Sequence, residues 1–268
     1  MKFRGKMNKT GKEQSTPKRR DAVYQLLQQC KIASAKEISK KLHVSEMTIR
    51  RDFEYLENKG LVERTHGGTI ISNRYNTALL FSQKNMLHIE AKQAIARSAA
   101  AYIQPYDTIF LNSGTTTMRI FPFITAEHVK IITNNPCIPL DEISENIEVI
   151  STGGIYNTES LTLVGGIANT SVGNVWATKS FIGIDGIDVN CGLTTPVEQE
   201  SYINRLMIEH TRGNIIIVAD SSKIGKISRF RVAPITSIHI LITDTDISNT
   251  DVEKFTNAGI QVIKASFL

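Results

Sequence analysis

The sequence of 268 residues lacks the features of several protein classes. It has no run of about 18 apolar residues, which a membrane-spanning helix needs, and its first twenty residues are polar and basic. Its three cysteines, Cys30, Cys137 and Cys191, form no Cys-x-x-Cys pair, and its six histidines show no metal-ligand spacing. We therefore expect a cytoplasmic protein with no disulfide framework, no metal and no other cofactor.

Basic residues outnumber acidic ones by two to one at one end of the chain. Residues 1–70 contain 16 Lys and Arg against 8 Asp and Glu, whereas residues 71–268 contain 15 against 18. Hydrophobic residues make up 41% of the chain, so a sizeable core can form. A basic segment joined to a near-neutral body is typical of a protein in which one part binds a polyanion and the other has a different task. Surface charge without such a role is the alternative.

Helical periodicity begins after a polar, unpatterned arm at residues 1–17. Apolar residues at three- and four-residue steps predict a first helix from residue 18 to residue 30, with Arg19 and Arg20 on its outer face. Ser34 begins the pattern of a capping box, which predicts a short second helix after it.

The third predicted helix follows after a tight turn, which makes a helix-turn-helix. Ser45 can cap this helix, and Ile49, Phe53 and Leu56 fall on one face of it. Its first turns would enter the major groove of DNA, where arginine donates two hydrogen bonds to guanine and threonine reaches a base edge. A solvated basic helix within a helical bundle is the alternative.

Two short β-prone runs follow Gly60 and flank the tripeptide His-Gly-Gly at residues 66–68, whose backbone freedom suits a hairpin tip. Such a hairpin, carrying Arg64, would lie along the adjacent DNA backbone or minor groove. It favours a winged helix-turn-helix domain over residues 18–72 instead of a helical bundle. The expected DNA-binding residues are Ser34, Ser45, Glu46, Thr48, Arg50, Arg51, Arg64, His66 and Gly67.

The rest of the chain alternates strand-like and helical segments after an expected linker at residues 73–89. A helical pattern runs from residue 90 to residue 103. Strands are predicted at residues 108–111, 129–133, 147–151, 180–184, 214–219, 238–243 and 261–263. This alternation predicts a larger α/β effector domain over residues 90–268 with a largely parallel sheet, in which ligands bind beyond the carboxyl ends of strands.

Polar loops follow several of these strands. Residues 112–117 read Asn-Ser-Gly-Thr-Thr-Thr before a predicted helix and suit a phosphate cradle, although no Gly-Lys-Ser/Thr ending makes them a Walker loop. Acidic residues and a lysine close other strands or open a helix. Ordinary turns and helix starts are the alternative for each. The expected ligand-binding residues are Asn112, Ser113, Gly114, Thr115, Thr116, Thr117, Asp185, Asp188, Glu198 and Lys223.

Both halves of the chain resemble one known family. V-S-E-M-T-I-R-R-D-F at residues 44–53 and G-L-V-E-R-T-H-G-G-T at residues 60–69 resemble the signature of the DeoR family of bacterial transcriptional repressors. The body is similar to the same family in N-S-G-T-T-T at 112–117, T-N-N at 133–135, T-G-G at 152–154, G-I-D-G-I-D at 183–188, G-L-T-T-P at 192–196 and A-D-S-S-K-I-G at 219–225.

The resemblance implies a sugar-phosphate-sensing effector domain whose fold is similar to ribose-5-phosphate isomerase. The hydroxyl-rich loop would hold the phosphate, Asp185 and Asp188 would face sugar hydroxyls, and Lys223 would pair with an anionic group. An isomerase would have a lysine in a glycine-rich segment after its Asp-Gly-x-Asp motif, and then a glutamate base. Residues 189–196 lack that lysine and interrupt the glycines, although Glu198 could still approach the ligand.

We therefore expect a sequence-specific regulator that binds double-stranded operator DNA as a dimer or tetramer and does not contact a membrane. It would repress a carbohydrate-utilisation operon and leave its operator when a phosphorylated sugar binds. A sugar-phosphate isomerase-like enzyme with an accessory DNA-binding domain is the alternative.

Overall fold

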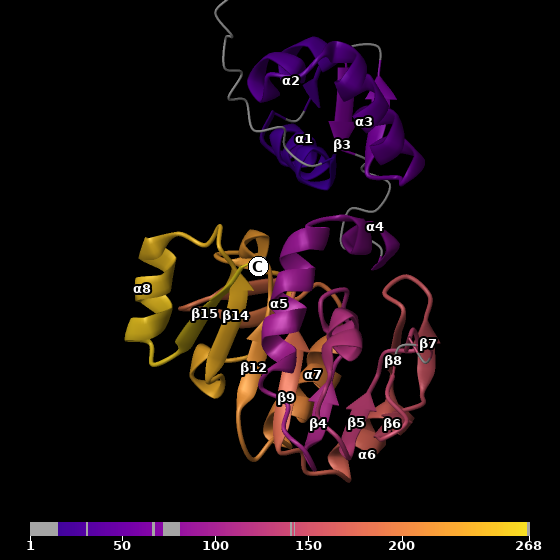
Figure 1. Cartoon of the computed structure of the whole chain (residues 1–268), viewed down its shortest axis with the longest axis vertical. Coiled ribbons are helices and arrows are strands. Elements are labelled where there is room, and N and C mark those ends of the chain that lie inside the picture. The colour runs from indigo at the N-terminus through magenta and orange to yellow at the C-terminus, as the bar shows by residue number, and fades with distance from the viewer. Residues whose placement is uncertain are drawn as a thin grey trace, which may run out of the picture. The chain divides into compact units, whose positions relative to one another are not determined.

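A computed structural model describes residues 16–30, 32–65, 68–71, 81–139, 141 and 143–266. The chain divides into two compact units, Met1–Asn73 and Arg74–Leu268 (Figure 1). Most of the arm expected at residues 1–17 lies outside the described residues, and the first helix begins at Thr16.

The first unit has three helices and a small sheet. Its helices are α1 (Thr16–Cys30), α2 (Ala35–Leu42) and α3 (Glu46–Asn58), and its strands are β1 (Ile32–Ala33), β2 (Val62–Thr65) and β3 (Gly68–Ile71). The predicted capping box is present, because the Ser34 hydroxyl accepts from the Glu37 N–H and the Glu37 carboxylate accepts from the Ser34 N–H. The predicted hairpin forms from β2 and β3, and β1 adds to β3 as a third antiparallel strand. These elements make a winged helix-turn-helix.

A parallel sheet of seven strands forms the centre of the second unit, in the order β15-β14-β12-β9-β4-β5-β6. Each of the seven predicted strands appears in it. The strands are β4 (Thr108–Leu111), β5 (Val129–Thr133), β6 (Ile147–Ser151), β9 (Lys179–Gly183), β12 (Ile215–Val218), β14 (Ile240–Asp244) and β15 (Gln261–Ala265).

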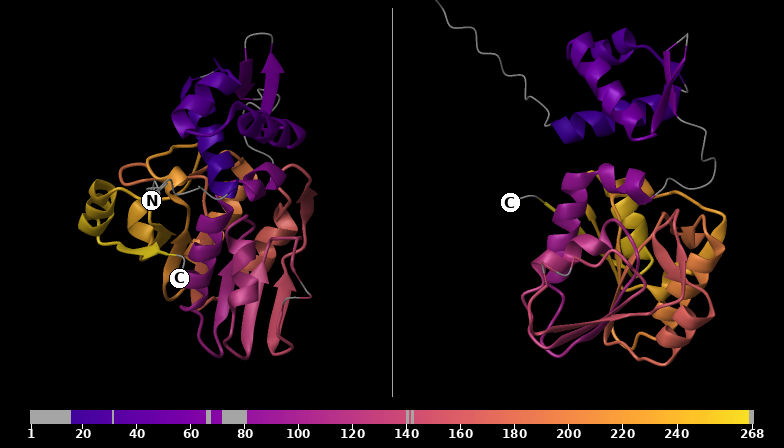
Figure 2. Two further views of the ribbon diagram at one scale, coloured as in Figure 1. Left: turned by 45° about the horizontal axis from the view of Figure 1, so that its top comes forward. Right: turned by 90° about the vertical axis from the view of Figure 1, so that its right-hand side faces the viewer.

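Helices cover both faces of this sheet (Figures 1 and 2). They are α4 (Phe81–Met86), α5 (Ile89–Ala100), α6 (Gly166–Gly173), α7 (Glu198–Glu209) and α8 (Asn249–Asn257), with the 3-10 helices η1 (Thr117–Phe123), η3 (Ser221–Lys223) and η4 (Ile235–Ser237). Alternate residues of the strands point to opposite faces. Ile109 of β4 joins a core with α5 and η1, whereas Phe110 joins a second core with α6, α7 and α8.

Several short elements were not predicted. They are β7 (Ile155–Asn157), β8 (Thr162–Val164), β10 (Gly186–Asp188), β11 (Gly192–Thr195) and β13 (Phe230–Ala233). The linker expected at residues 73–89 also differs from the structure, because α4 lies within that range and belongs to the second unit. No helix among the described residues is long and apolar enough to cross a membrane.

Candidate functional site

Helix α3 presents the expected DNA-binding surface of the first unit. The Ser45 hydroxyl caps the helix by accepting from the Thr48 N–H at 3.2 Å, and the two hydroxyl oxygens lie 2.8 Å apart. Arg50 and Arg51 are exposed on the same helix, as is Glu46 at its start. The helix therefore offers two guanidinium groups that have no partner among the described residues, beside an N-terminus that attracts phosphate.

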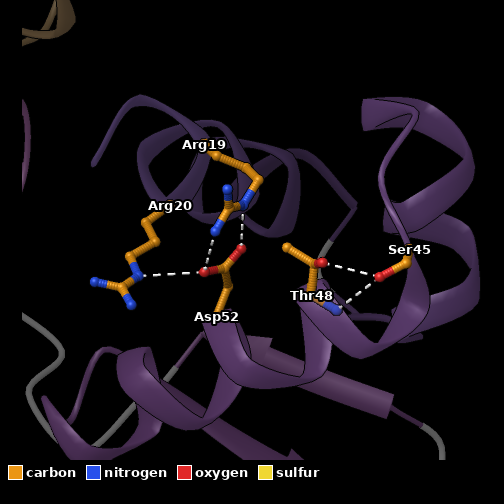
Figure 3. Close-up of polar contacts among 5 residues, drawn as sticks. All are labelled: Arg19, Arg20, Ser45, Thr48 and Asp52. Carbon is orange, nitrogen blue, oxygen red and sulfur yellow. Dashed lines mark hydrogen bonds and ion pairs between the residues drawn. The ribbon is translucent and has the colours of Figure 1, made fainter. Parts of the chain in front are cut away.

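Helix α3 is held against α1 by an ion pair (Figure 3). Asp52 is 1% exposed, and it accepts from Arg19 Nε at 2.6 Å and from Arg20 Nε at 3.2 Å. The expectation that both arginines point outward is wrong. An apolar stripe shows which face of α1 is buried, but it does not reveal a buried carboxylate on another helix that needs cationic partners.

The hairpin and the start of α2 carry the other expected DNA contacts. Arg64 is exposed, and its Nε lies 2.9 Å from the Glu57 carboxylate of α3. His66 and Gly67 lie outside the described residues. The N–H and the hydroxyl of Ser34 are both engaged with Glu37, and its carbonyl accepts from the Ile38 N–H, so Ser34 acts mainly as the N-cap of α2.

The second unit has a polar pocket at the carboxyl ends of β4, β9 and β12. Its lining combines the loop after β4, three lysines and three acidic side chains, with a few apolar groups. The lining includes Phe81, Lys84, Lys92, Asn112, Ser113, Gly114, Thr115, Thr116, Ser160, Asp185, Thr195, Glu200, Asn204, Asp220 and Lys223. A pocket at this edge of a parallel sheet is where α/β proteins bind ligands.

Asn112 holds the loop after β4 in place. Its Nδ2 donates to the Gly183 carbonyl and to Asn204 Oδ1, and its Oδ1 accepts from the Gly183 N–H at 2.8 Å. Its amide donors are thus both used inside the protein. The Ser113 N–H donates to Asn134 Oδ1 at 2.7 Å. The loop is therefore fixed by the protein itself.

The next three residues present donors to the pocket. The backbone N–H groups of Gly114, Thr115 and Thr116 have no hydrogen-bond partner among the described residues. A Cβ at Gly114 would lie 2.9 Å from Thr117 Oγ1, so this tight turn needs glycine. Consecutive N–H groups with two adjacent threonine hydroxyls make a concave site suited to an anion. Thr117 is fully buried and donates instead to the Asn112 carbonyl.

An ion pair lies on the other side of the pocket. Lys84 Nζ is 2.6 Å from Asp185 Oδ1, and both side chains are about one-fifth exposed, at 22% and 20%. Burial opposes the charge on Lys84, but Asp185 and Glu200 outweigh it and raise the pKa of Lys84. Burial likewise opposes the charge on Asp185, yet Lys84 and Lys223 lower the pKa of this carboxyl. Both groups are therefore charged at neutral pH.

The pKa values of the two other carboxyls of the pocket are shifted in opposite directions. Burial raises the pKa of Glu200, whose Oε1 has no hydrogen-bond partner among the described residues. Burial also works against the charge on Asp220, but Lys223, His88 and Lys92 lower the pKa of Asp220 to about 2. The side-chain ammonium of Lys223 forms no hydrogen bond and no ion pair within 4.0 Å with any described residue, although its backbone N–H donates to the Asp220 carbonyl. Its ammonium is thus the cation most available to a ligand.

The structure brings together most of the predicted ligand-binding residues, namely Asn112, Ser113, Gly114, Thr115, Thr116, Asp185 and Lys223. It does not bring Thr117, Asp188 or Glu198 to the pocket. Asp188 accepts from the N–H groups of Asn190 and Cys191 in the β10–β11 turn, and Glu198 is exposed at the start of α7. Glu200, two residues later, faces the pocket instead, because successive positions on a helix point about 100° apart.

The predictions missed two lysines of the pocket, Lys84 and Lys92. Lys84 lies in the range expected as a linker. Lys92 is 3% exposed and lies three residues before Ile95, on the buried stripe of α5. A charged residue on a stripe predicted to be buried was the available signal.

Both units of the chain match known protein families. Residues 19–74 match the DeoR-like helix-turn-helix domain, and residues 87–245 match the DeoR C terminal sensor domain. One structure with a similar fold is a D-ribose-5-phosphate isomerase in complex with phospho-erythronic acid, at a TM-score of 0.38 and 16% identity. That alignment covers 51% of this chain and 54% of the isomerase.

Relatives align over nearly the whole chain. The HTH-type transcriptional regulator GlpR of Haloferax volcanii is 31% identical over 91% of this chain and 96% of its own length. The putative aga operon transcriptional repressor of Escherichia coli O157:H7 is 33% identical over 92% of this chain and 93% of its own length. The lactose phosphotransferase system repressor of Staphylococcus epidermidis is 31% identical over 88% of this chain and 93% of its own length. The predicted resemblance is confirmed: the chain belongs to the DeoR family and is a DNA-binding transcriptional regulator, not an enzyme.

Proposed function

We propose that this regulator represses a carbohydrate-utilisation operon and that a phosphorylated sugar, bound in the pocket of the second unit, releases it from its operator. The observation that carries the proposal is the group of three N–H donors at Gly114, Thr115 and Thr116, which no described residue pairs with, in the same pocket as Lys223. A phosphate has several acceptor oxygens and negative charge, which such donors and an ammonium match.

The rest of the pocket suits a sugar. Asp185 and Glu200 can accept hydrogen bonds from sugar hydroxyls, and Glu200 has a carboxyl oxygen without a partner among the described residues. Hydrogen-bonding groups that are left unpaired without the ligand discriminate strongly against molecules lacking the matching hydroxyls. The name of one relative, the lactose phosphotransferase system repressor, refers to a carbohydrate system and supports this ligand class.

On the DNA side, the proposed contacts are the N-terminal half of α3 and the hairpin. Arg50, Arg51 and Thr48 would reach base edges or phosphates in the major groove, while Arg64 would lie along the flanking backbone. We further propose a dimer or tetramer that acts in the cytoplasm and places two such units on two operator half-sites.

A thermal-shift screen tests the ligand class. The probes are ribose 5-phosphate, fructose 1-phosphate, glucose 6-phosphate and galactosamine 6-phosphate, each beside its unphosphorylated sugar and beside inorganic phosphate. A ligand at a hundred times its Kd stabilises the folded protein by about 2.7 kcal/mol. For a protein of this size that corresponds to a rise in Tm of about 5–10 °C.

Two variants locate the site. Thr115→Val removes one hydroxyl and keeps the shape of the side chain, and Lys223→Gln removes the free ammonium. Each should weaken a binding phosphosugar at least tenfold, whereas Lys130→Gln, which breaks an exposed ion pair with Glu148 on the sheet edge, should have no effect. Equal binding of phosphorylated and unphosphorylated sugars, or binding by none of the probes, would contradict the proposal.

A further inference from the structure

Helix α4 is part of the pocket. Phe81 and Lys84, one turn apart on this helix, both line it, and the Phe81 side chain is 8% exposed. The Phe81 N–H donates to the Glu159 carbonyl in the β7–β8 turn at 3.2 Å. In the sequence, α4 is the first described element after the winged helix-turn-helix unit. The same short helix therefore touches the pocket and lies next along the chain to the DNA-binding unit.

The attachments of α4 lead to segments that line the pocket or directly follow its lining residues in the chain. Lys84 pairs with Asp185, which follows β9, at 2.6 Å. Arg119 of η1, two residues after the hydroxyl-rich loop, donates from Nη2 to Asn85 Oδ1 at 2.6 Å and to the Asn85 carbonyl at 3.1 Å. Lys92 lines the pocket and donates from Nζ to the carbonyls of Leu87, at 2.7 Å, and Lys84.

These attachments are polar, and a ligand can compete for them. Asp185 can bind either the Lys84 ammonium or sugar hydroxyls, and Lys84 can bind either Asp185 or a phosphate oxygen. Arg119 is only partly used, since its Nε is buried without a hydrogen-bond partner among the described residues. A helix of six residues has little stability of its own, so its position depends on these contacts.

We propose that Lys84 is a ligand-binding residue delivered to the pocket by α4, and that its exchange of Asp185 for the ligand couples pocket occupancy to the DNA-binding unit. This inference rests on the proposed function, because it needs an anionic, hydroxyl-bearing ligand in the same pocket. Asn85 does not line the pocket, so its contact with Arg119 acts on the position of α4 and not on the ligand. A coupling role for α4 thus predicts that substitutions at Lys84 and at Asn85 both reduce release from DNA, but that only the substitution at Lys84 weakens ligand binding.

Lys84→Met should weaken the binding of ribose 5-phosphate, or of whichever probe gives the largest thermal shift, at least tenfold. Asn85→Ala should leave that affinity within twofold. Both should reduce the ratio of DNA affinities measured without and with saturating probe by at least fivefold, on a duplex selected from a random pool by the full wild-type chain. Lys130→Met, which removes a lysine from an exposed ion pair away from the pocket, should change neither quantity.

Hydrogen exchange provides a direct readout on α4. Saturating probe should alter the exchange of the amides of residues 82–87 in the wild type and in Lys130→Met, and this response should be lost in Lys84→Met. A probe that raises Tm while leaving these amides unchanged would overturn the coupling role and leave the proposed function standing. Wild-type DNA-release ratios in Asn85→Ala would overturn it as well. No thermal shift with any probe would overturn both proposals together.

Discussion

Asp52 of α3 accepts a hydrogen bond from Arg19 of α1 at 2.6 Å, with the Asp52 side chain 1% exposed and the Arg19 side chain 16% exposed. The carboxylate also accepts from Arg20 at 3.2 Å. A charge at this depth is stable only because it is paired. The contact therefore helps to fix the orientation of the helix that carries the proposed DNA-reading side chains.

Asp52→Asn should destabilise the first unit by about 3 kcal/mol, because it leaves two partly buried guanidinium groups without their anion. This loss corresponds to roughly a hundredfold fall in the hydrogen-exchange protection of the α3 amides. Glu57→Gln is the matched control. It removes the exposed partner of Arg64 and should cost no more than about 1 kcal/mol. Similar protection in both variants would refute the structural role of Asp52.

Arg50→Ala should weaken operator binding by about 1–3 kcal/mol if the guanidinium contacts a guanine. If it contacts a phosphate, the loss should be similar on all sequences, and the slope of log K against log salt should fall by about one. Fluorescence anisotropy over a salt series separates these cases. Arg229→Ala, an exposed arginine of the second unit, is the control. A parallel loss of phosphosugar affinity in Arg50→Ala would contradict the separation of the two tasks.

Asp220→Asn should destabilise the second unit by about 2 kcal/mol at pH 7, because the pKa of Asp220 is lowered to about 2 from an ordinary value of 3.8. A lowered carboxyl pKa stabilises the fold above the unfolded value. The contribution is lost as the pH falls from about 4 to about 2, where the variant and the wild type should converge. Urea unfolding followed by the fluorescence of Trp176, the single tryptophan, measures this. The exposed Asp246→Asn is the control.

Glu200→Gln should have the opposite dependence on pH. Burial raises the pKa of Glu200, so stability is lost as the pH rises from the unfolded-state pKa through the higher folded-state pKa. The variant should match the wild type at pH 4 and exceed its Tm by about 2 °C at pH 8. Glu198→Gln removes an exposed carboxylate two residues away and should leave Tm unchanged at both values. A lower Tm for Glu200→Gln at pH 8 would be inconsistent with this assignment.

The sequence was sufficient to predict the elements that repeat a clear pattern. β4, β5 and β6 begin and end at the predicted residues, since each is an apolar run bounded by polar segments. Ser34 and Ser45 cap α2 and α3 as predicted, because capping depends on neighbours three residues away. β1 has two residues, which is too few to show any period.

Contacts between residues far apart in the sequence could not be predicted from local patterns. The partners Lys84 and Asp185 are 101 residues apart, and no local spacing relates them. Asp52 lies between Ile49 and Phe53 on the buried face of α3, where a charge indicates that a partner exists without identifying it. The Asp185-Gly186-Ile187-Asp188 motif shows the same limit, because its first carboxylate faces the pocket and its last one closes a turn.

The Asn112 amide forms hydrogen bonds with Gly183 and Asn204, so the proposed anion-binding end of the pocket is held in shape by the protein alone. The opposite wall is assembled from α4, α7 and the segment after β9, which are separate stretches of chain. Substitutions in this wall would alter which sugar fits, while the proposed phosphate contacts at the other end of the pocket would be retained. Under the proposed function, a fixed end and a variable wall would allow one architecture to acquire new effectors through few substitutions.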